Sequence, residues 1–154
     1  MTKLPGFENN EFWLYAHMSD FVRVMVLLEE GGIYLDTDIV ITKPWGNRGF
    51  HNNIAYEMYD GGRLNNNVLI FEKNSSFLQL LLKVMLKEYD GLGYEAGPEL
   101  ITRVVEQNNI DDLDVCIISA TNFQPVDWRG ISEVIWFEGV DGEESKRYFV
   151  GCFF

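Results

Sequence analysis

Two aspartates, separated by one residue, are the strongest chemical feature of this sequence. Asp36 and Asp38 lie in the segment GGIYLDTDIVIT, which spans residues 31–42. The apolar and β-branched residues around them predict a buried strand over residues 33–42. Residues at i and i+2 of a strand share one face about 7 Å apart, so we expect Tyr34, Asp36 and Asp38 to point the same way.

Two like charges in such apolar surroundings are costly. Burial and mutual repulsion both raise the pKa of a carboxyl group unless a cation is present. A hard divalent ion would take oxygen ligands from the protein and from a diphosphate. The sequence therefore predicts a divalent-metal site at the carboxyl end of a strand, where α/β sheets bind ligands. The alternative for an Asp-x-Asp pair is two solvated acids on an edge strand, or acids paired to Arg or Lys.

A polar pair precedes the aspartates on a predicted helix. The segment SDFVRVMVLLEE, residues 19–30, has Ser19 as its expected N-cap and ends at the Gly31-Gly32 pair. Asp20 and Arg23 are three residues apart, on one side of this otherwise apolar helix. In one interpretation they form an exposed ion pair worth about 0.2–0.5 kcal/mol. In the other, the glycines fold the helix back, and the pair reaches the same crevice as the two aspartates and binds hydroxyl groups.

The elements that must position these residues alternate between helix and strand. Further strands are expected at 68–71, 116–119 and 134–139, and further helices at 77–89 and 98–107. This order predicts an α/β fold with a mainly parallel sheet flanked by helices. With no internal repeat or linker, residues 1–154 are expected to form a single domain. The final apolar run, YFVGCFF, is expected to pair as a strand and indicates part of a longer fold.

Charge and cysteine content limit the possible partners. The net charge of −12 disfavours nucleic acid and anionic membrane surfaces, and an anionic ligand would need a divalent cation or local basic residues. No run of the sequence is apolar for long enough to cross a bilayer. Cys116 and Cys152 are too few and too far apart for a zinc site, and they leave the redox compartment undetermined.

Three motifs in order resemble a known family. Residues 19–38, read as S-D-x-x-R, an apolar stretch and G-G-x-Y-x-D-x-D, resemble the sugar-binding DXD region of the GT-A retaining glycosyltransferases. The segment RLNNNVLIFEKNSSFLQLLLKVMLKEYDGLGYEAGPELITRVV and the loop NFQPVDW resemble the α-1,4-glycosyltransferase group that contains the globotriaosylceramide synthases. The resemblance implies a partial GT-A domain, with the DXD core at 19–45 and the α-1,4-glycosyltransferase-like region at 64–128.

The resemblance also implies residue roles. Asp36 and Asp38 match the catalytic, metal-binding aspartates, with Asp38 on Mn²⁺ and Asp36 also touching the ribose or the donor sugar. The other positions that it implies for substrate binding are Asp20 and Arg23 on the sugar hydroxyls, Tyr34, Asn65 near the donor sugar, and Gly97 and Pro98 facing the acceptor.

The implied activity is transfer of a hexose from a UDP-sugar to a glycan or glycolipid acceptor, with retention of configuration, by a Golgi enzyme. Two features depart from the family: Asn66-Asn67 replaces its Gly-Ala, and its nucleotide-binding strand and helix are absent before Ser19. One alternative is therefore a truncated, inactive homologue that binds sugar or metal. Another is a haloacid-dehalogenase-type phosphatase using Asp-x-Asp-x-Val, for which Asp111-Asp112 is badly placed.

Overall fold

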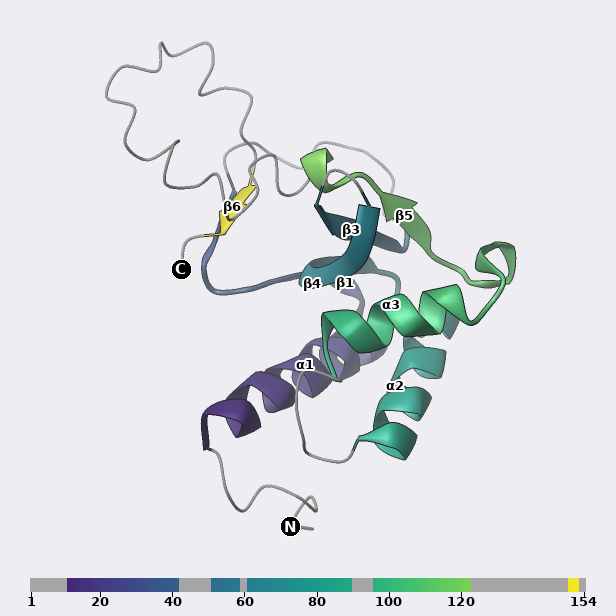
Figure 1. The fold of residues 1–154 in the computed structure, drawn as a ribbon, viewed down its shortest axis with the longest axis horizontal. Helices are drawn as coiled ribbons and strands as arrows, with labels where there is room; N and C mark the ends of the chain where they lie inside the picture. Colours follow the sequence, from purple (N-terminus) through teal and green to yellow (C-terminus); the bar gives the residue numbers. More distant parts are fainter. Residues whose placement is uncertain (1–10, 42–50, 59–60, 90–95, 123–149, 153–154) are drawn as a thin grey trace.

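The computed structural model describes residues 11–41, 51–58, 61–89, 96–122 and 150–152 (Figure 1). The elements, in chain order, are α1 (Glu11–Glu30), β1 (Gly32–Leu35), β2 (Ile39–Ile41), β3 (Asn53–Met58), β4 (Gly61–Phe71), α2 (Ser76–Glu88), α3 (Pro98–Glu106), the 3-10 turn η1 (Ile110–Asp112), β5 (Cys116–Ile118), a second 3-10 turn η2 (Ala120–Asn122) and β6 (Val150–Cys152).

The described strands form a four-stranded sheet in the order β1-β4-β3-β5. The α/β class and the flanking helices are confirmed, but the described sheet is mixed instead of mainly parallel. Strand β4 runs antiparallel to both β1 and β3, and only β3 and β5 run parallel. Only two residues separate the end of β3 at Met58 from the start of β4 at Gly61, and such short connections join antiparallel strands.

The strand expected over residues 33–42 is broken at the aspartates. Strand β1 ends at Leu35, and the Ile39 N–H donates to the Asp36 carbonyl at 3.2 Å, which closes a turn. Beyond the turn, β2 leaves the sheet and pairs antiparallel with β6, so the expected pairing of the final apolar run is confirmed. The prediction of one continuous strand was therefore wrong, although Tyr34 and Asp36 do lie together, since the Tyr34 hydroxyl donates to Oδ1 of Asp36. Aspartate and threonine favour turns, and here this preference outweighs the strand propensity of their neighbours.

Helix α1 begins eight residues before its expected start, at Glu11 instead of Ser19. Ser19 lies inside the helix, where its hydroxyl donates to the Ala16 carbonyl at 2.7 Å. The predicted N-cap was therefore wrong, because the residues before Ser19 continue the helix. The expected end is confirmed, since the Gly31 N–H donates to the Leu27 carbonyl at 2.8 Å and Gly31 has a φ of +69°.

The two later helices match their expected positions. Ser75 caps α2 by accepting a hydrogen bond from the Leu78 N–H at 3.4 Å, and Pro98 is the first residue of α3. Strand β5 also lies where expected, but it is an edge strand and Cys116 is exposed. The strand expected at 134–139 lies outside the described residues.

Helices α1, α2 and α3 gather on one side of the sheet and share one core with it (Figure 1). This core includes Val24 of α1, Phe77, Leu81 and Met85 of α2, and Ile101 of α3. A smaller cluster on other strand positions joins Ala55, Val68 and Ile70 to the β2 residue Ile39. Apolar residues on the outer side of α1 stay exposed, namely Tyr15, Met18, Val22, Met25 and Val26. No helix in the described part of the chain is both long and apolar enough to span a bilayer.

Candidate functional site

The guanidinium of Arg23 lies between two carboxylates from different parts of the chain. Its Nη2 is 3.3 Å from Oδ1 of Asp20, one turn earlier on α1. Its Nη1 is 3.0 Å from Oδ1 of Asp36, which follows β1. The Arg23 side chain is only 6% exposed. The Asp20–Arg23 pair is thus not an isolated exposed pair, because the Gly31-Gly32 turn brings α1 back beside the first aspartate of the Asp-x-Asp segment.

The remaining N–H groups of Arg23 are also engaged. Nε and Nη2 donate to the carbonyl and the hydroxyl of Ser19 at 3.3 and 3.0 Å. Nη1 also donates to the Asn66 carbonyl of β4 at 2.6 Å. A guanidinium has five N–H donors, and together with the two carboxylate contacts these bonds use all of them. Arg23 is therefore held by protein groups from α1, β4 and the segment after β1.

Tyr34 of β1 completes this arrangement. Its ring centroid lies 4.7 Å from the guanidinium carbon of Arg23, and its hydroxyl donates to Oδ1 of Asp36 at 2.9 Å. Burial raises the pKa of Tyr34 to about 12, so the hydroxyl stays protonated and remains a donor. Within the described residues, the contacts of the Asp36 carboxylate fall on Oδ1 and leave Oδ2 for a ligand.

Asn66 and Gly97 hold the other carboxylate. The Asn66 amide donates to Oδ1 of Asp20 at 2.7 Å. A Cβ at Gly97 would lie 2.9 Å from Oδ2 of Asp20, so the start of α3 approaches this carboxylate closely. The signal for Asn66 in the sequence is the run of three asparagines that precedes the apolar residues 68–71. We call Asp20, Arg23, Tyr34, Asp36 and Asn66 the Arg23 cluster.

Burial dominates the electrostatics of both carboxylates. It raises the pKa of Asp20 above its usual range, although Arg23 and Asn66 act in the opposite direction. It also raises the pKa of Asp36, and the nearby negative charge of Asp38 adds to this effect. The expected cost of placing acids in these surroundings is thus confirmed for Asp36.

The carboxylate oxygens at and near Asp38 suit a metal ion that is shared with a bound ligand. Asp38 lies in the turn after Asp36 and is half-buried, and within the described part of the chain no hydrogen bond or ion pair holds its carboxylate. The same residues contain no group of three or more His, Cys, Asp or Glu side chains arranged around a metal. A hard divalent ion bound with a diphosphate needs only one or two protein carboxylates. Oδ2 of Asp36 and the Asp38 carboxylate would supply these.

Two other predicted site residues lie beside the cluster in the fold. The Asn65 side-chain carbonyl accepts a hydrogen bond from the Asn67 N–H at 2.9 Å. Pro98 follows Gly97 at the start of α3, and its carbonyl accepts from the Thr102 hydroxyl at 2.7 Å. Asn65 and Pro98 thus directly neighbour Asn66 and Gly97 in the chain.

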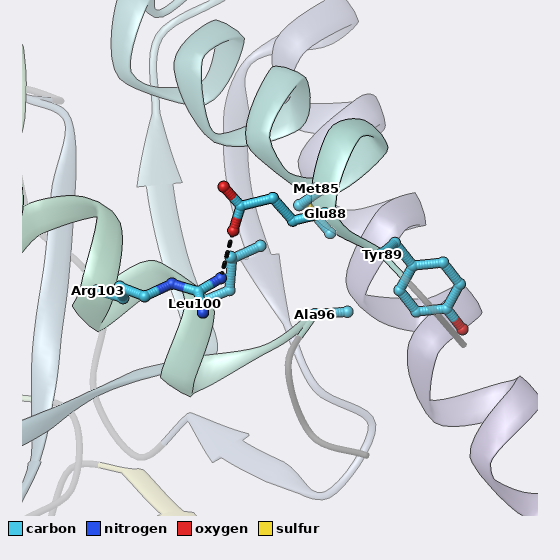
Figure 2. Close-up of a pocket in the computed structure, with 6 residues that line it drawn as sticks. All are labelled: Met85, Glu88, Tyr89, Ala96, Leu100 and Arg103. Atoms are coloured by element: carbon cyan, nitrogen blue, oxygen red, sulfur yellow. Dashed lines mark hydrogen bonds and ion pairs between the residues drawn. The ribbon is translucent and has the colours of Figure 1, made fainter. Parts of the chain in front are cut away.

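Two hollows in the described structure lie apart from the cluster. The first, of about 10 Å³, is between α2 and α3, beside the Glu88–Arg103 ion pair, and has room for little more than one water (Figure 2). The second is open, and its acidic lining repels phosphates. Its acidic residues are Glu72, Asp111, Asp112 and Asp114.

Residues 4–59 match the family model described as the glycosyltransferase sugar-binding region containing DXD motif. This stretch is similar to a glycosyltransferase sugar-binding region. This region includes Asp20, Arg23, Tyr34 and both aspartates of the Asp-x-Asp segment, so the resemblance seen in the sequence is confirmed. The match leaves the phosphatase alternative without support, and Asp111 and Asp112 line a different hollow.

Relatives extend the match beyond this glycosyltransferase region. Lactosylceramide 4-alpha-galactosyltransferase of Rattus norvegicus is 29% identical over 146 residues, which cover 89% of this chain and 39% of that protein. The protein of the same name from Mus musculus is 31% identical over 139 residues, 84% of this chain and 37% of that protein. The solved structure of the PaToxG glycosyltransferase has a TM-score of 0.46 at 30% identity, over 60% of this chain and 35% of that one. The chain spans about two fifths of the length of the curated relatives that it matches.

Proposed function

We propose that this chain supplies the donor-sugar and metal site of a retaining hexosyltransferase that uses a UDP-sugar with Mn²⁺ or Mg²⁺. One observation carries the proposal. A single buried guanidinium, on Arg23, fixes the carboxylates of Asp20 and Asp36 beside Asp38, inside the matched glycosyltransferase region. Buried acids held in this way are typical of sites that bind charged or hydroxylated ligands.

The Asp-x-Asp aspartates would hold the ion. When bound, a divalent metal offsets the negative charge that develops on the departing diphosphate. Asp38 and Oδ2 of Asp36 are the protein oxygens that would bind it. Tyr34 donates to Oδ1 of Asp36 and would leave Oδ2 for the ion.

The remaining predicted residues would orient the substrates. Asp20 and Asp36 would accept hydrogen bonds from hydroxyls of the donor, and Arg23 would fix both carboxylates from inside the protein. Asn65 would lie near the donor sugar, with Gly97 and Pro98 on the acceptor side. These roles make the cluster a sugar-positioning device built on α1, β1, β4 and the start of α3.

The relatives support a substrate class for this proposal. Their name, lactosylceramide 4-alpha-galactosyltransferase, supports galactose as the transferred hexose and a glycolipid or glycan as its acceptor. A Golgi location for the whole protein is what the family resemblance implies. The net charge of −12 agrees with metal dependence, because an acidic protein needs a cation to bind a nucleotide diphosphate.

A second candidate is a homologue that binds the donor without turnover. Asn66 and Asn67 are both buried, so their side chains occupy interior space where the family has Gly-Ala. If these side chains block the acceptor or tilt the sugar, the chain would bind UDP-galactose and leave it intact.

Turnover tests the proposal. UDP release from UDP-galactose is measured with Mn²⁺ for the wild-type chain, Asp36→Ala and Asp38→Ala, with the acidic-hollow variant Asp112→Ala as control. We expect each site variant to lose on the order of 10²–10³-fold in rate, the scale seen when one stabilising group is removed from a transition state. The control should keep its rate. Wild-type release that persists in both site variants contradicts the proposal, and tight binding without release identifies the inactive homologue.

A further inference from the structure

We infer that Asn66 is a positioning residue that holds the Asp20 carboxylate in place for the donor sugar. The inference rests on the proposed function and adds a residue to it. By sequence alone, Asn66 is only extra bulk where the family has a small residue. In the structure it contacts both members of the α1 pair.

The side chain of Asn66 contacts Asp20, and its main chain contacts Arg23. Its amide donates to Oδ1 of Asp20 at 2.7 Å. Its carbonyl accepts from Nη1 of Arg23 at 2.6 Å. Asn66 is only 6% exposed, so both contacts are shielded from water. Removing the side chain leaves the carbonyl in place, and a variant at this position therefore tests the Asp20 contact separately.

The Asp20 carboxylate has little freedom to turn. Oδ1 already receives the Asn66 amide and lies 3.3 Å from Nη2 of Arg23. Oδ2 lies close to Gly97. A Cβ at position 97 would be 2.9 Å from Oδ2 and 3.4 Å from the amide nitrogen of Asn66. The Asp20 side chain is 13% exposed, and this remaining edge is what a sugar hydroxyl would contact. The Asn66 amide and Gly97 thus fix the orientation of the exposed edge of the Asp20 carboxylate.

The residue type at position 66 matters because the contact needs a donor. Alanine or glycine provides none, and Asp20 would keep only the longer contact to Arg23. An ionised aspartate is an acceptor and would repel Asp20 at this distance. Loss of one such bond changes an affinity by about 10-fold.

The test is the ratio of two affinities, measured by calorimetry in the presence of Mn²⁺. Affinity for UDP-galactose divided by affinity for UDP reports the contribution of the hexose alone. We expect Asn66→Ala to lower this ratio by about 10-fold and Asn66→Asp to lower it further, while affinity for UDP stays within about 2-fold of wild type. An unchanged ratio in both variants overturns the inference.

Asn52→Ala is the matched control. Asn52 is another buried asparagine, and its side chain accepts from the Glu72 N–H at 2.6 Å and donates to Asp114 at 2.7 Å. It has no described contact with the Arg23 cluster, so its loss should lower stability without changing the ratio. An equal fall of the ratio in Asn52→Ala would show a general structural effect and also overturn the inference.

The contact can be checked without any ligand. A double-mutant cycle of Asn66→Ala and Asp20→Ala, followed by urea unfolding, should be non-additive because the two side chains are bonded. A wild-type chain that does not prefer UDP-galactose to UDP contradicts the proposed function, and with it any role for the donor. Additive unfolding contradicts the contact itself, so the two failures are distinguishable.

Discussion

At the scale of single residues, Arg23 has the largest structural role in the site. It lies between Asp20 and Asp36, and its other N–H groups bond to Ser19 and to the Asn66 carbonyl. Removing one partner of a buried charge group leaves the others uncompensated, which is far more costly than losing a pair on the surface. The stability of the chain should therefore depend strongly on this one side chain.

Arg23→Ala should lower the free energy of unfolding by about 3–5 kcal/mol. Urea denaturation measures this loss. The control is Arg103→Ala, because Arg103 pairs with Glu88 at 2.7 Å but both side chains are about 40% exposed. A pair so exposed contributes at most about 1 kcal/mol. Similar losses in the two variants would contradict the central place of Arg23.

Asp36 should make both stability and metal binding depend on pH. Burial raises its pKa above the ordinary value of 3.8. The folded chain therefore holds this proton more tightly than the unfolded chain, so the contribution of Asp36 to stability is present below 3.8 and is lost as pH rises through its folded pKa. A metal needs the ionised carboxylate, so affinity for Mn²⁺ with UDP should rise over the same range.

Calorimetric titration of Mn²⁺ in the presence of UDP, from about pH 4.5 to pH 7, checks this prediction. Asp36→Asn is the control, since it removes the titrating group. This variant should lose the part of the pH dependence of Mn²⁺ affinity that Asp36 causes. A profile that is the same in the wild type and in Asp36→Asn would show that Asp36 is not the group responsible.

Part of the site was predictable from residue types and spacing. The i, i+3 spacing of Asp20 and Arg23 and the glycine turn suggested that both reach the Asp-x-Asp segment, and Arg23 does contact Asp36. The contact between Asn66 and Asp20 was not predictable, because it depends on how β4 packs beside α1. The continuous strand through Asp36 and Asp38 was predicted wrongly, because β1 ends at Leu35 and a turn follows.

At the scale of elements, the turn between α1 and β1 sets the geometry of the site. Gly31 and Gly32 both have positive φ, at +69° and +108°, and they reverse the chain so that β1 runs back beside the helix. The two glycines differ in their surroundings. A Cβ at Gly31 would lie 2.6 Å from the Lys73 main-chain nitrogen, whereas a Cβ at Gly32 would meet nothing within 4 Å.

Gly31→Ala should therefore destabilise the chain more than Gly32→Ala. We expect losses of about 2–4 kcal/mol for Gly31→Ala, which combines backbone strain with a main-chain clash. Gly32→Ala adds strain alone, about 1–2 kcal/mol. Thermal unfolding of both variants gives the comparison, and a larger loss for Gly32→Ala would contradict the close approach of this turn to the segment after β4.

Local signals predicted some elements better than others. Helices α2 and α3 were readable because the cap at Ser75, the first-position Pro98 and the apolar stripes are all local in sequence. Strand β3 was missed and the strand directions were wrong, because pairing joins residues that are distant in the chain. The same holds for β2, whose partner β6 lies more than 100 residues away.

At the scale of the whole molecule, charge and shape favour a metal-dependent site for an anionic ligand. The net charge is −12, and the open hollow beside β5 is lined by acids. Helices α1 to α3 cover one side of the sheet (Figure 1). The Arg23 cluster joins α1 to β1 and β4, beside the start of α3. A nucleotide diphosphate would meet an unfavourable potential over this chain unless a divalent cation accompanies it.

The most direct test of the metal site is the affinity for UDP with and without Mn²⁺, measured by calorimetry on the wild-type chain and on the double variant Asp36→Asn, Asp38→Asn. If the two aspartates share an ion with the diphosphate, Mn²⁺ should tighten UDP binding by at least about 10-fold in the wild type and by much less in the double variant. Equal UDP affinity with and without Mn²⁺ in the wild type, or full Mn²⁺ dependence in the double variant, would contradict the proposed site.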